Sequence, residues 1–180
     1  KILIDQGYVI NNYHGLFGLN KIPWVLAQLS TIFVFLVVVN AINFIDGIDG
    51  LAISQVIKGI VLFEIFSSQT TEISSIGKLI IFSLIPLYYF NFKKKRKIFL
   101  GDAGSMLLGT IIMVYILYLL GDNYEVNKNL YLNKTLLSVL IVFHPLVDLL
   151  RVFFLRVIKG LSPYVADQNH IHHKLLNFYK

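Results

Sequence analysis

The sequence predicts an all-α polytopic membrane protein, with about five transmembrane helices and a short extracytoplasmic β-hairpin at the N-terminus. Of its 180 residues, 56% are hydrophobic and only 14% are charged, whereas soluble domains are about 45–50% apolar and about 25% charged. The mean hydropathy is +0.70. The charged residues are also gathered in short segments between long apolar stretches. We therefore expect lipid around most of the chain.

Five apolar segments are candidates for helices that cross the bilayer, because about 20 apolar residues span its hydrocarbon core. They are Trp24–Ile45, Leu51–Ser67, Ile76–Phe92, Met106–Leu120 and Leu136–Ile158. The second segment is shorter and contains Lys58 and Glu64. The last carries Asp148 and Arg151 near its middle, where they can pair at i and i+3 on one helix face.

Apolar and polar residues alternate before the first helix, and an Asp-Gln-Gly turn at residues 5–7 divides them. This pattern is typical of a small hairpin outside the bilayer. We divide the chain into an extracytoplasmic hairpin or loop over 1–23, a transmembrane helical region over 24–158 and a cytoplasmic His-containing loop over 159–180. Because the chain starts at Lys1 without a Met, we expect it to lack its natural N-terminus.

Each crossing reverses the side of the membrane, so the loops at 46–50 and 93–105 and the tail after Lys159 share one side. That side carries the basic run at residues 93–97, and an excess of Lys and Arg marks the cytoplasm. The run is first a topology anchor, with contacts to anionic lipid or substrate phosphate as a second role. It also explains the net charge of +6 without nucleic acid. The absence of Cys excludes disulfides and thiolate metal sites.

The first of three polar segments on that side ends the first helix and contains two Asp–Gly turns. Asn40 and Asn43 precede the turns at i and i+3, so two amides are expected to converge with the carboxylates of Asp46 and Asp49. The plain alternative is a tight re-entrant connection with solvated carboxylates. Placing so many polar groups beside lipid is costly without a use, so we interpret the segment as functional.

The second segment, residues 99–105, precedes the apolar helix that starts at Met106. Ser105 or a neighbour such as Gly104 is expected to cap that helix, whose N–H groups and dipole suit a phosphate. Asp102 lies just before it and can hold Mg²⁺ against that phosphate, since Mg²⁺ favours one or two carboxylates plus phosphate oxygens. The alternative is that Asp102 is only an N-cap.

The third segment contains His170, His172 and His173 within four positions. Zinc is one reading, but the usual ligand spacings are absent and adjacent His residues do not easily bind one ion together. Imidazoles that hold a diphosphate fit better, because they titrate near neutral pH and donate hydrogen bonds. Together the three segments predict a metal-assisted phosphoryl-transfer site that opens to the cytoplasm.

Three stretches, at residues 40–52, 99–109 and 167–173, resemble the polyprenyl-phosphate N-acetylhexosamine-1-phosphate transferase family, which is glycosyl transferase family 4. Their order, spacing and helical context agree over nearly the whole chain. The Ser-Pro-Tyr sequence at 162–164 favours the branch that transfers N-acetylglucosamine-1-phosphate to undecaprenyl phosphate. The branch that uses a muramyl-pentapeptide, the phospho-N-acetylmuramoyl-pentapeptide transferases, is the alternative.

The resemblance implies that Asp102 is the Mg²⁺ ligand, that Asp46 and Asp49 lie near the nucleotide and metal, and that the His residues hold the diphosphate. The implied substrate-binding set is Asn43, Gly104, Ser105, His170, His172 and His173. The implied substrates are a UDP-N-acetylhexosamine and undecaprenyl phosphate, with UMP released and Mn²⁺ as an alternative to Mg²⁺. The implied location is the bacterial inner membrane, among its lipids, with the site facing the cytoplasm.

The family also carries an adjacent Asp-Asp pair at the end of an earlier helix, and this sequence has none. We expect that pair upstream of residue 1, so it stays open whether the chain is active alone. Two other classes stay open as well, a transporter lined by the ionisable residues within the helices and an inactive membrane fragment. The identity of the sugar, the downstream polymer and a homodimer are not decided by the sequence.

Overall fold

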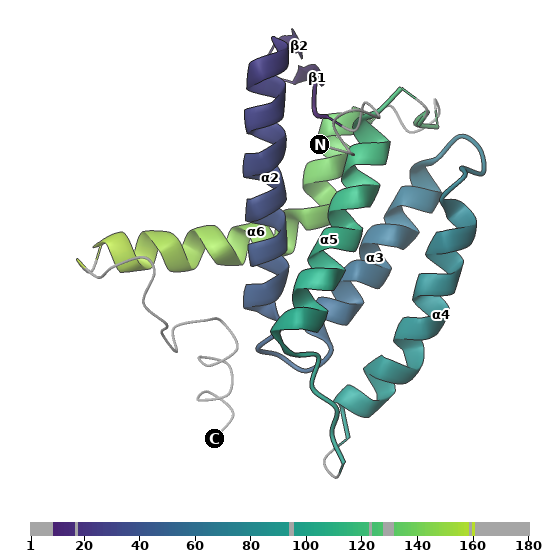
Figure 1. Ribbon diagram of the computed structural model, residues 1–180, viewed down its shortest axis with the longest axis vertical. Helices are drawn as coiled ribbons and strands as arrows, with labels where there is room; N and C mark the ends of the chain where they lie inside the picture. The colour runs from purple at the N-terminus through teal and green to yellow at the C-terminus, as the bar shows by residue number, and fades with distance from the viewer. Residues whose placement is uncertain are drawn as a thin grey trace.

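The structure is a computed structural model that describes residues 9–16, 18–93, 96–122, 124–127, 132–158 and 160. Its elements are a two-stranded hairpin followed by five helices (Figure 1). They are β1 (Asn12–Leu16), β2 (Leu19–Lys21), α2 (Trp24–Ile45), α3 (Leu51–Phe66), α4 (Ser74–Asn91), α5 (Gly101–Leu120) and α6 (Lys134–Ile158). The helical class and the hairpin near the N-terminus are therefore confirmed.

The hairpin that the structure describes lies later than the predicted turn. Its strands pair antiparallel, with Asn12 opposite Lys21 and Leu16 opposite Leu19. The predicted turn at residues 5–7 lies outside the described residues. The hairpin sits at the start of α2, beside the end of α5 and the start of α6 (Figure 1).

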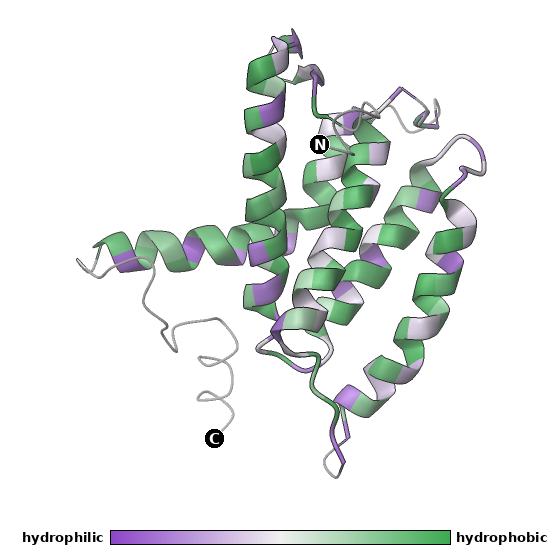
Figure 2. Cartoon of the chain, in the orientation of Figure 1, coloured by the Kyte–Doolittle hydropathy of each residue, from purple (hydrophilic) through white to green (hydrophobic). Residues whose placement is uncertain are grey.

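The prediction of five transmembrane helices is confirmed only in part. Three helices, α2, α5 and α6, are long and apolar enough to cross a membrane. The α3 helix has 16 residues, about 24 Å of helix, and includes Lys58 and Glu64. The 18 residues of α4 include Lys78, several Ser and Asn91. Figure 2 shows apolar residues along most of each helix, with many hydrophilic residues at the two ends of the bundle.

Successive helices α2 to α5 run antiparallel, with α5 between α2 and α3 and with α4 outermost beside α3 (Figure 1). In an apolar window of 18 residues, 61% of the α5 residues are buried, against 22% of the α2 residues. The α5 helix therefore forms the centre of the core. We call the end that holds residues 46–50, 91–93 and 96–102 the Asp–Gly end. The end that holds 12–16, 18–21, 67–73, 121–122 and 124–127 is the hairpin end.

The α6 helix changes direction sharply near its middle, and its second half runs across the bundle (Figure 1). Pro145 lies inside this helix, and a proline removes one helical hydrogen bond and clashes with the preceding turn. The predicted apolar segment Leu136–Ile158 is therefore helical, and the helix is bent near Pro145. The predicted pair on the second half is confirmed, because Arg151 Nη2 lies 2.9 Å from Asp148 Oδ1. The tail after Lys159 lies outside the described residues, apart from Gly160.

Candidate active site

A polar cluster at the Asp–Gly end joins the last turn of α2 to the first turns of α5. The Nδ2 atom of Asn43 donates to Ser105 Oγ over 2.7 Å and lies 3.5 Å from Asp102 Oδ1. Ser105 is fully buried, and its hydroxyl lies 3.1 Å from the carbonyl oxygens of Gly101 and Asp102. Two of the predicted polar segments therefore meet in space.

The close approach of α2 and α5 depends on Gly109, two turns after Asp102. A Cβ atom on Gly109 would lie 2.8 Å from the Cα atom of Val39, and backbone atoms cannot move aside as a flexible side chain can. Small residues allow such close contacts between helices in membranes. Because Val39 lies one turn before Asn43, this contact sets the distance across which Asn43 reaches α5.

Asp46 follows the last residue of α2 and carries a perturbed carboxyl group. Burial, and then the negative charges of Asp102 and Asp49, raise the pKa of Asp46 to about 6. Within the described ranges, no hydrogen bond or ion pair is made to this carboxyl. The carboxylates of Asp46, Asp49 and Asp102 therefore repel one another, and that of Asp46 has no hydrogen-bonding partner among the described residues. A bound cation would stabilise this arrangement.

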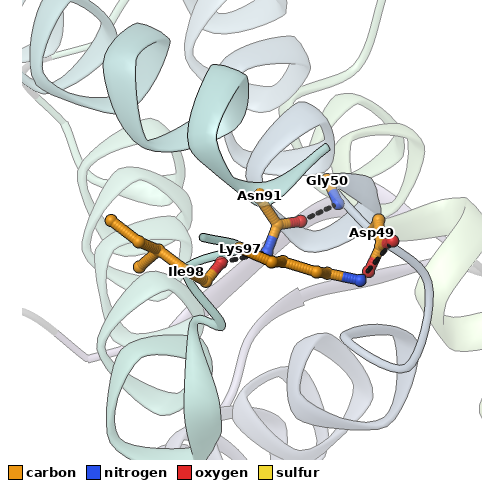
Figure 3. Close-up of polar contacts among 5 residues, drawn as sticks. All are labelled: Asp49, Gly50, Asn91, Lys97 and Ile98. Carbon is orange, nitrogen blue, oxygen red and sulfur yellow. Dashed lines mark hydrogen bonds and ion pairs between the residues drawn. The ribbon is translucent and has the colours of Figure 1, made fainter. Parts of the chain in front are cut away.

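A buried amide ties the loop after α2 to the loop after α4 (Figure 3). Asn91 Oδ1 accepts from the Gly50 N–H over 2.5 Å, and Asn91 Nδ2 donates to the Ile98 carbonyl over 2.8 Å. Beside it, Lys97 Nζ lies 2.5 Å from Asp49 Oδ2. One side chain thus satisfies a donor of one loop and an acceptor of the other, and the ion pair holds Asp49 at the same junction.

Gly50 is required where this junction meets α3. Its φ is +72°, a conformation that glycine adopts without strain. A Cβ atom here would overlap the Phe92 ring and lie 2.8 Å from Tyr88 Cε2. The rings of Tyr88 and Phe92 pack with centroids 4.8 Å apart, so the second Asp–Gly turn is closed on one side by an aromatic wall from α4.

The predicted convergence of two asparagines at this end is wrong for one of them. The Asn40 amide donates to the Leu36 carbonyl of its own helix over 2.7 Å, whereas Asn43 faces α5. A spacing of i and i+3 places the two residues on a similar helical face. The rotation of α2 about its axis, however, directs only the Asn43 side chain toward α5. The Asn40 side chain is therefore a structural group within α2.

The predicted capping role of Ser105 or Gly104 is also wrong. The α5 helix begins at Gly101, with Leu100 at the N-cap position and no side-chain capping bond. Asp102 consequently lies in the first helical turn, where the helix dipole favours negative charge. The apolar pattern placed the start of the helix at Met106, more than one turn late. The first-turn N–H groups have no partner within the helix, so polar residues are common there.

Asn91 is the functional candidate that sequence reasoning missed. It is only 5% exposed, although it ends an apolar helix where a polar residue is expected to face water. The local pattern contained no sign of its two partners.

His170, His172 and His173 lie outside the described residues. Glu64 and Lys58, the two ionisable residues of α3, lie apart from each other. Glu64 accepts from Ser74 near the hairpin end, and Lys58 lines a groove between α3 and α4.

The Asp–Gly end offers the oxygen ligands that a hard divalent cation prefers. Within the described residues, no group of three or more His, Asp and Glu side chains is arranged to hold a metal ion by itself. Mg²⁺ usually needs only one or two protein carboxylates and takes its other ligands from water and substrate phosphates. Asp102, whose negative charge helps to raise the pKa of the nearby Asp46, fits that requirement.

The comparison with known proteins gives one family match and many relatives. The family described as "Glycosyl transferase family 4" matches residues 2–120. The "Undecaprenyl-phosphate alpha-N-acetylglucosaminyl 1-phosphate transferase" of Yersinia pestis is 30% identical over 86% of this chain and 43% of its own length. The protein of the same name from Escherichia coli (strain K12) is 28% identical over 97% of this chain and 46% of its own.

A third relative comes from Bacillus subtilis (strain 168) and is named "Probable undecaprenyl-phosphate N-acetylglucosaminyl 1-phosphate transferase". It is 31% identical over 88% of this chain and 42% of its own length. The chain thus spans less than half the length of these curated relatives. No solved structure matches it.

Proposed function

The chain belongs to glycosyl transferase family 4, and on this basis we propose that the whole protein transfers N-acetylhexosamine-1-phosphate from a UDP-sugar to undecaprenyl phosphate. The proposed sugar is N-acetylglucosamine, the sugar named in its relatives. The observation that carries the proposal is the cluster of Asn43, Asp102 and Ser105, with Asp46 beside it. This reaction would begin the assembly of a cell-envelope polysaccharide at the membrane.

In the proposed reaction, an oxygen of the lipid phosphate attacks the phosphorus that carries the sugar. The bond from that phosphorus to the bridging oxygen breaks, and UMP leaves with the bridging oxygen. A lipid-diphosphate-sugar stays in the membrane. The protein's task in such a transfer is chiefly to position the groups and to balance negative charge.

Each described residue of the cluster has a task in this proposal. Asp102 is the metal ligand, Asp46 and Asp49 add negative charge beside it, and Asn43 fixes the Asp102 carboxylate. Bound Mg²⁺, or Mn²⁺, would supply charge neutralisation of the substrate diphosphate. The first-turn N–H groups of α5, which begins at Gly101, are available to phosphate oxygens. Gly104 and Ser105 follow this turn and are proposed to complete the substrate-binding set. The three His residues near the C-terminus are proposed to hold the diphosphate.

We place the site on the cytoplasmic face of the bacterial inner membrane. The basic run at residues 93–97 lies in the loop between α4 and α5, and Lys and Arg are enriched in cytoplasmic loops. The same face would expose the Asp–Gly end to a soluble UDP-sugar, while the acceptor lipid reaches it from the bilayer.

The test is an assay of UMP release by the whole protein with UDP-N-acetylglucosamine, undecaprenyl phosphate and Mg²⁺. Replacing Asp102 by Asn removes the carboxylate charge but keeps the shape of the side chain. We expect release to fall by on the order of 100-fold or more, as when a preorganised charge is removed from an active site. Normal turnover by D102N would refute the assignment.

A matched control is Asp122→Asn, which makes the same change in an exposed residue at the hairpin end. This variant should release UMP at the wild-type rate. Running the assay with UDP-N-acetylgalactosamine and UDP-muramoyl-pentapeptide in place of UDP-N-acetylglucosamine identifies the donor. Preference for the pentapeptide donor would replace the proposed sugar but keep the type of reaction.

A further inference from the structure

A groove lies between α3 and α4, on the opposite side of α5 from α2. Its volume is about 380 Å³. It is lined by Ser54, Ile57, Lys58, Val61, Ile85 and Tyr88. All of these residues except Ser54, Lys58 and Tyr88 are aliphatic, so the groove combines a long apolar surface with one cation.

Lys58 occupies an unusual position for a charged residue. It lies seven residues after Leu51, the first residue of α3, which is about 10 Å along the helix axis. Helical side chains lean toward the N-terminus of their helix, so the ammonium is directed toward the Asp–Gly end. No carboxylate within the described ranges forms an ion pair with it. A cation inside an apolar layer needs a counter-charge.

We propose that this groove binds an anionic phospholipid of the bilayer, with the headgroup phosphate at Lys58 and the acyl chains along the apolar wall. Val61 is 40% exposed and Ile85 is 52% exposed, so both offer free apolar surface to such a chain. Basic pockets between membrane helices on the cytoplasmic side are known to recognise lipid headgroups. A headgroup phosphate supplies the charge that Lys58 lacks.

The position of the groove favours a bilayer phospholipid over the acceptor lipid. The cluster of Asn43, Asp102 and Ser105 lies between α2 and α5, whereas the groove lies between α3 and α4. A phosphate held by Lys58 would therefore stand away from the carboxylates at which transfer is proposed. It would act as a bound structural lipid and not as a reactant.

The groove also touches the Asp–Gly loop through one shared residue. Tyr88 lines the groove, and its ring packs over Gly50, where a Cβ atom would come within 2.8 Å of it. A lipid in the groove would press Tyr88 toward Gly50 and hold the aromatic wall in place. We therefore expect the bound phospholipid to stabilise the loop that carries Asp49.

The experiment uses the whole protein in nanodiscs of phosphatidylcholine that contain a minor fraction of phosphatidylglycerol. The phosphatidylglycerol that stays bound is counted by native mass spectrometry after release into detergent. Replacing Lys58 by Leu should lower retention about fivefold, the effect of one basic residue at a membrane surface. Lys58→Arg, which keeps the charge, should retain the lipid. Lys78→Leu, on α4 near the hairpin end, is the matched control and should also retain it.

Equal retention by wild type and K58L would overturn the proposal. So would displacement of the bound phosphatidylglycerol by undecaprenyl phosphate at equal concentration, because the groove would then be a site for the acceptor lipid. Leucine is compatible with the lipid-facing surface, so K58L should fold, and size-exclusion chromatography checks this. Because the readout is lipid retention, failure here leaves the proposed transferase reaction untouched.

Discussion

The two ends of the helix bundle use their polar side chains in different ways. At the hairpin end, a series of polar side chains bonds to backbone carbonyls, and Ser74 Oγ in addition donates to Glu64 Oε2. His14 Nε2 lies 3.0 Å from the Leu120 carbonyl oxygen, and Lys134 Nζ donates to the Gly121 carbonyl over 2.8 Å. These bonds satisfy carbonyl groups where α5 ends, which the helix itself leaves without partners.

The same pattern continues across the hairpin. Thr135 Oγ1 donates to the Tyr13 carbonyl over 2.8 Å, and Asn133 Nδ2 donates to the His14 carbonyl. The buried hydroxyl of Tyr124 donates to the Phe63 carbonyl over 2.8 Å, and burial raises the pKa of this phenol. Each of these side chains connects two segments and is occupied by that contact.

At the Asp–Gly end, Asn91 also bonds backbone groups, but the other polar side chains contact one another and the carboxylates lie close together. Asn43 bridges Ser105 and Asp102, Lys97 pairs with Asp49, and the pKa of Asp46 is raised by its carboxylate neighbours as well as by burial. Negative groups held together in this way destabilise the fold unless something binds them. The difference shows that the polar groups of the hairpin end stabilise the fold, whereas the carboxylates of the Asp–Gly end are available to a ligand.

Of the positions that test this difference between the two ends, Asn91 is expected to give the largest effect when it is replaced. Asn91→Ala leaves the Gly50 N–H and the Ile98 carbonyl without their partner, at about 1–3 kcal/mol for each group. It also frees the loop that carries Asp49, so UMP release should fall at least about tenfold in the folded fraction. Thermal unfolding and the transfer assay measure the two effects.

Asn40→Ala is the matched control for that variant, because the Asn40 amide bonds only to Leu36 within its own helix. It should change neither quantity by more than a small amount. Asn91→Asp keeps an acceptor for Gly50 but turns a buried, negatively charged oxygen toward the Ile98 carbonyl, so a loss at least as large as that of Asn91→Ala is expected. If Asn91→Ala and Asn40→Ala behaved alike, Asn91 would have no positioning role.

A smaller effect, confined to stability, is expected at the hairpin end. Thr135→Val keeps the shape of a buried side chain and removes its bond to the Tyr13 carbonyl, which should cost about 1 kcal/mol. The rate of UMP release per folded molecule should not change. Thr110→Val serves as the control, since Thr110 is bonded within α5 to the Met106 carbonyl. A lower rate in T135V would show that the two ends are coupled.

The smallest effect concerns the pH dependence of stability in the absence of divalent metal. The pKa of Asp46 is about 6 in the folded protein against an ordinary value of 3.8. Between these values the folded state holds more protons than the unfolded state, so stability falls as the pH rises from about 4 to about 6. Asp46→Asn should remove this fall.

Chelator-treated protein, unfolded by heat at a series of pH values, supplies the measurement. The Thr135→Val variant is a useful reference because it should lower stability without altering the pH slope. A D46N variant with the wild-type slope would mean that the pH dependence of stability does not arise from Asp46.

Much of the fold follows from local sequence patterns. Each of the five predicted apolar segments corresponds to a helix. The loop that contains Asp46 and the first turn of α5, which contains Asp102, lie at one end of the bundle. The count of crossings predicted that shared end, and the contact from Asn43 to Asp102 and Ser105 agrees with it. The roles assigned to these residues remain predictions, and the His residues lie outside the described residues.

What the sequence by itself determined is which segments are helical and which loops share an end, because apolar length and charge act residue by residue along the chain. Only the tertiary structure decided that Asn43 and not Asn40 meets α5, that Asn91 joins two loops, that α6 bends across the bundle and that Lys58 faces a groove. These features depend on how each helix is rotated and how closely it packs. A single contact such as Gly109 against Val39 sets that packing, and hydropathy carries no information about it.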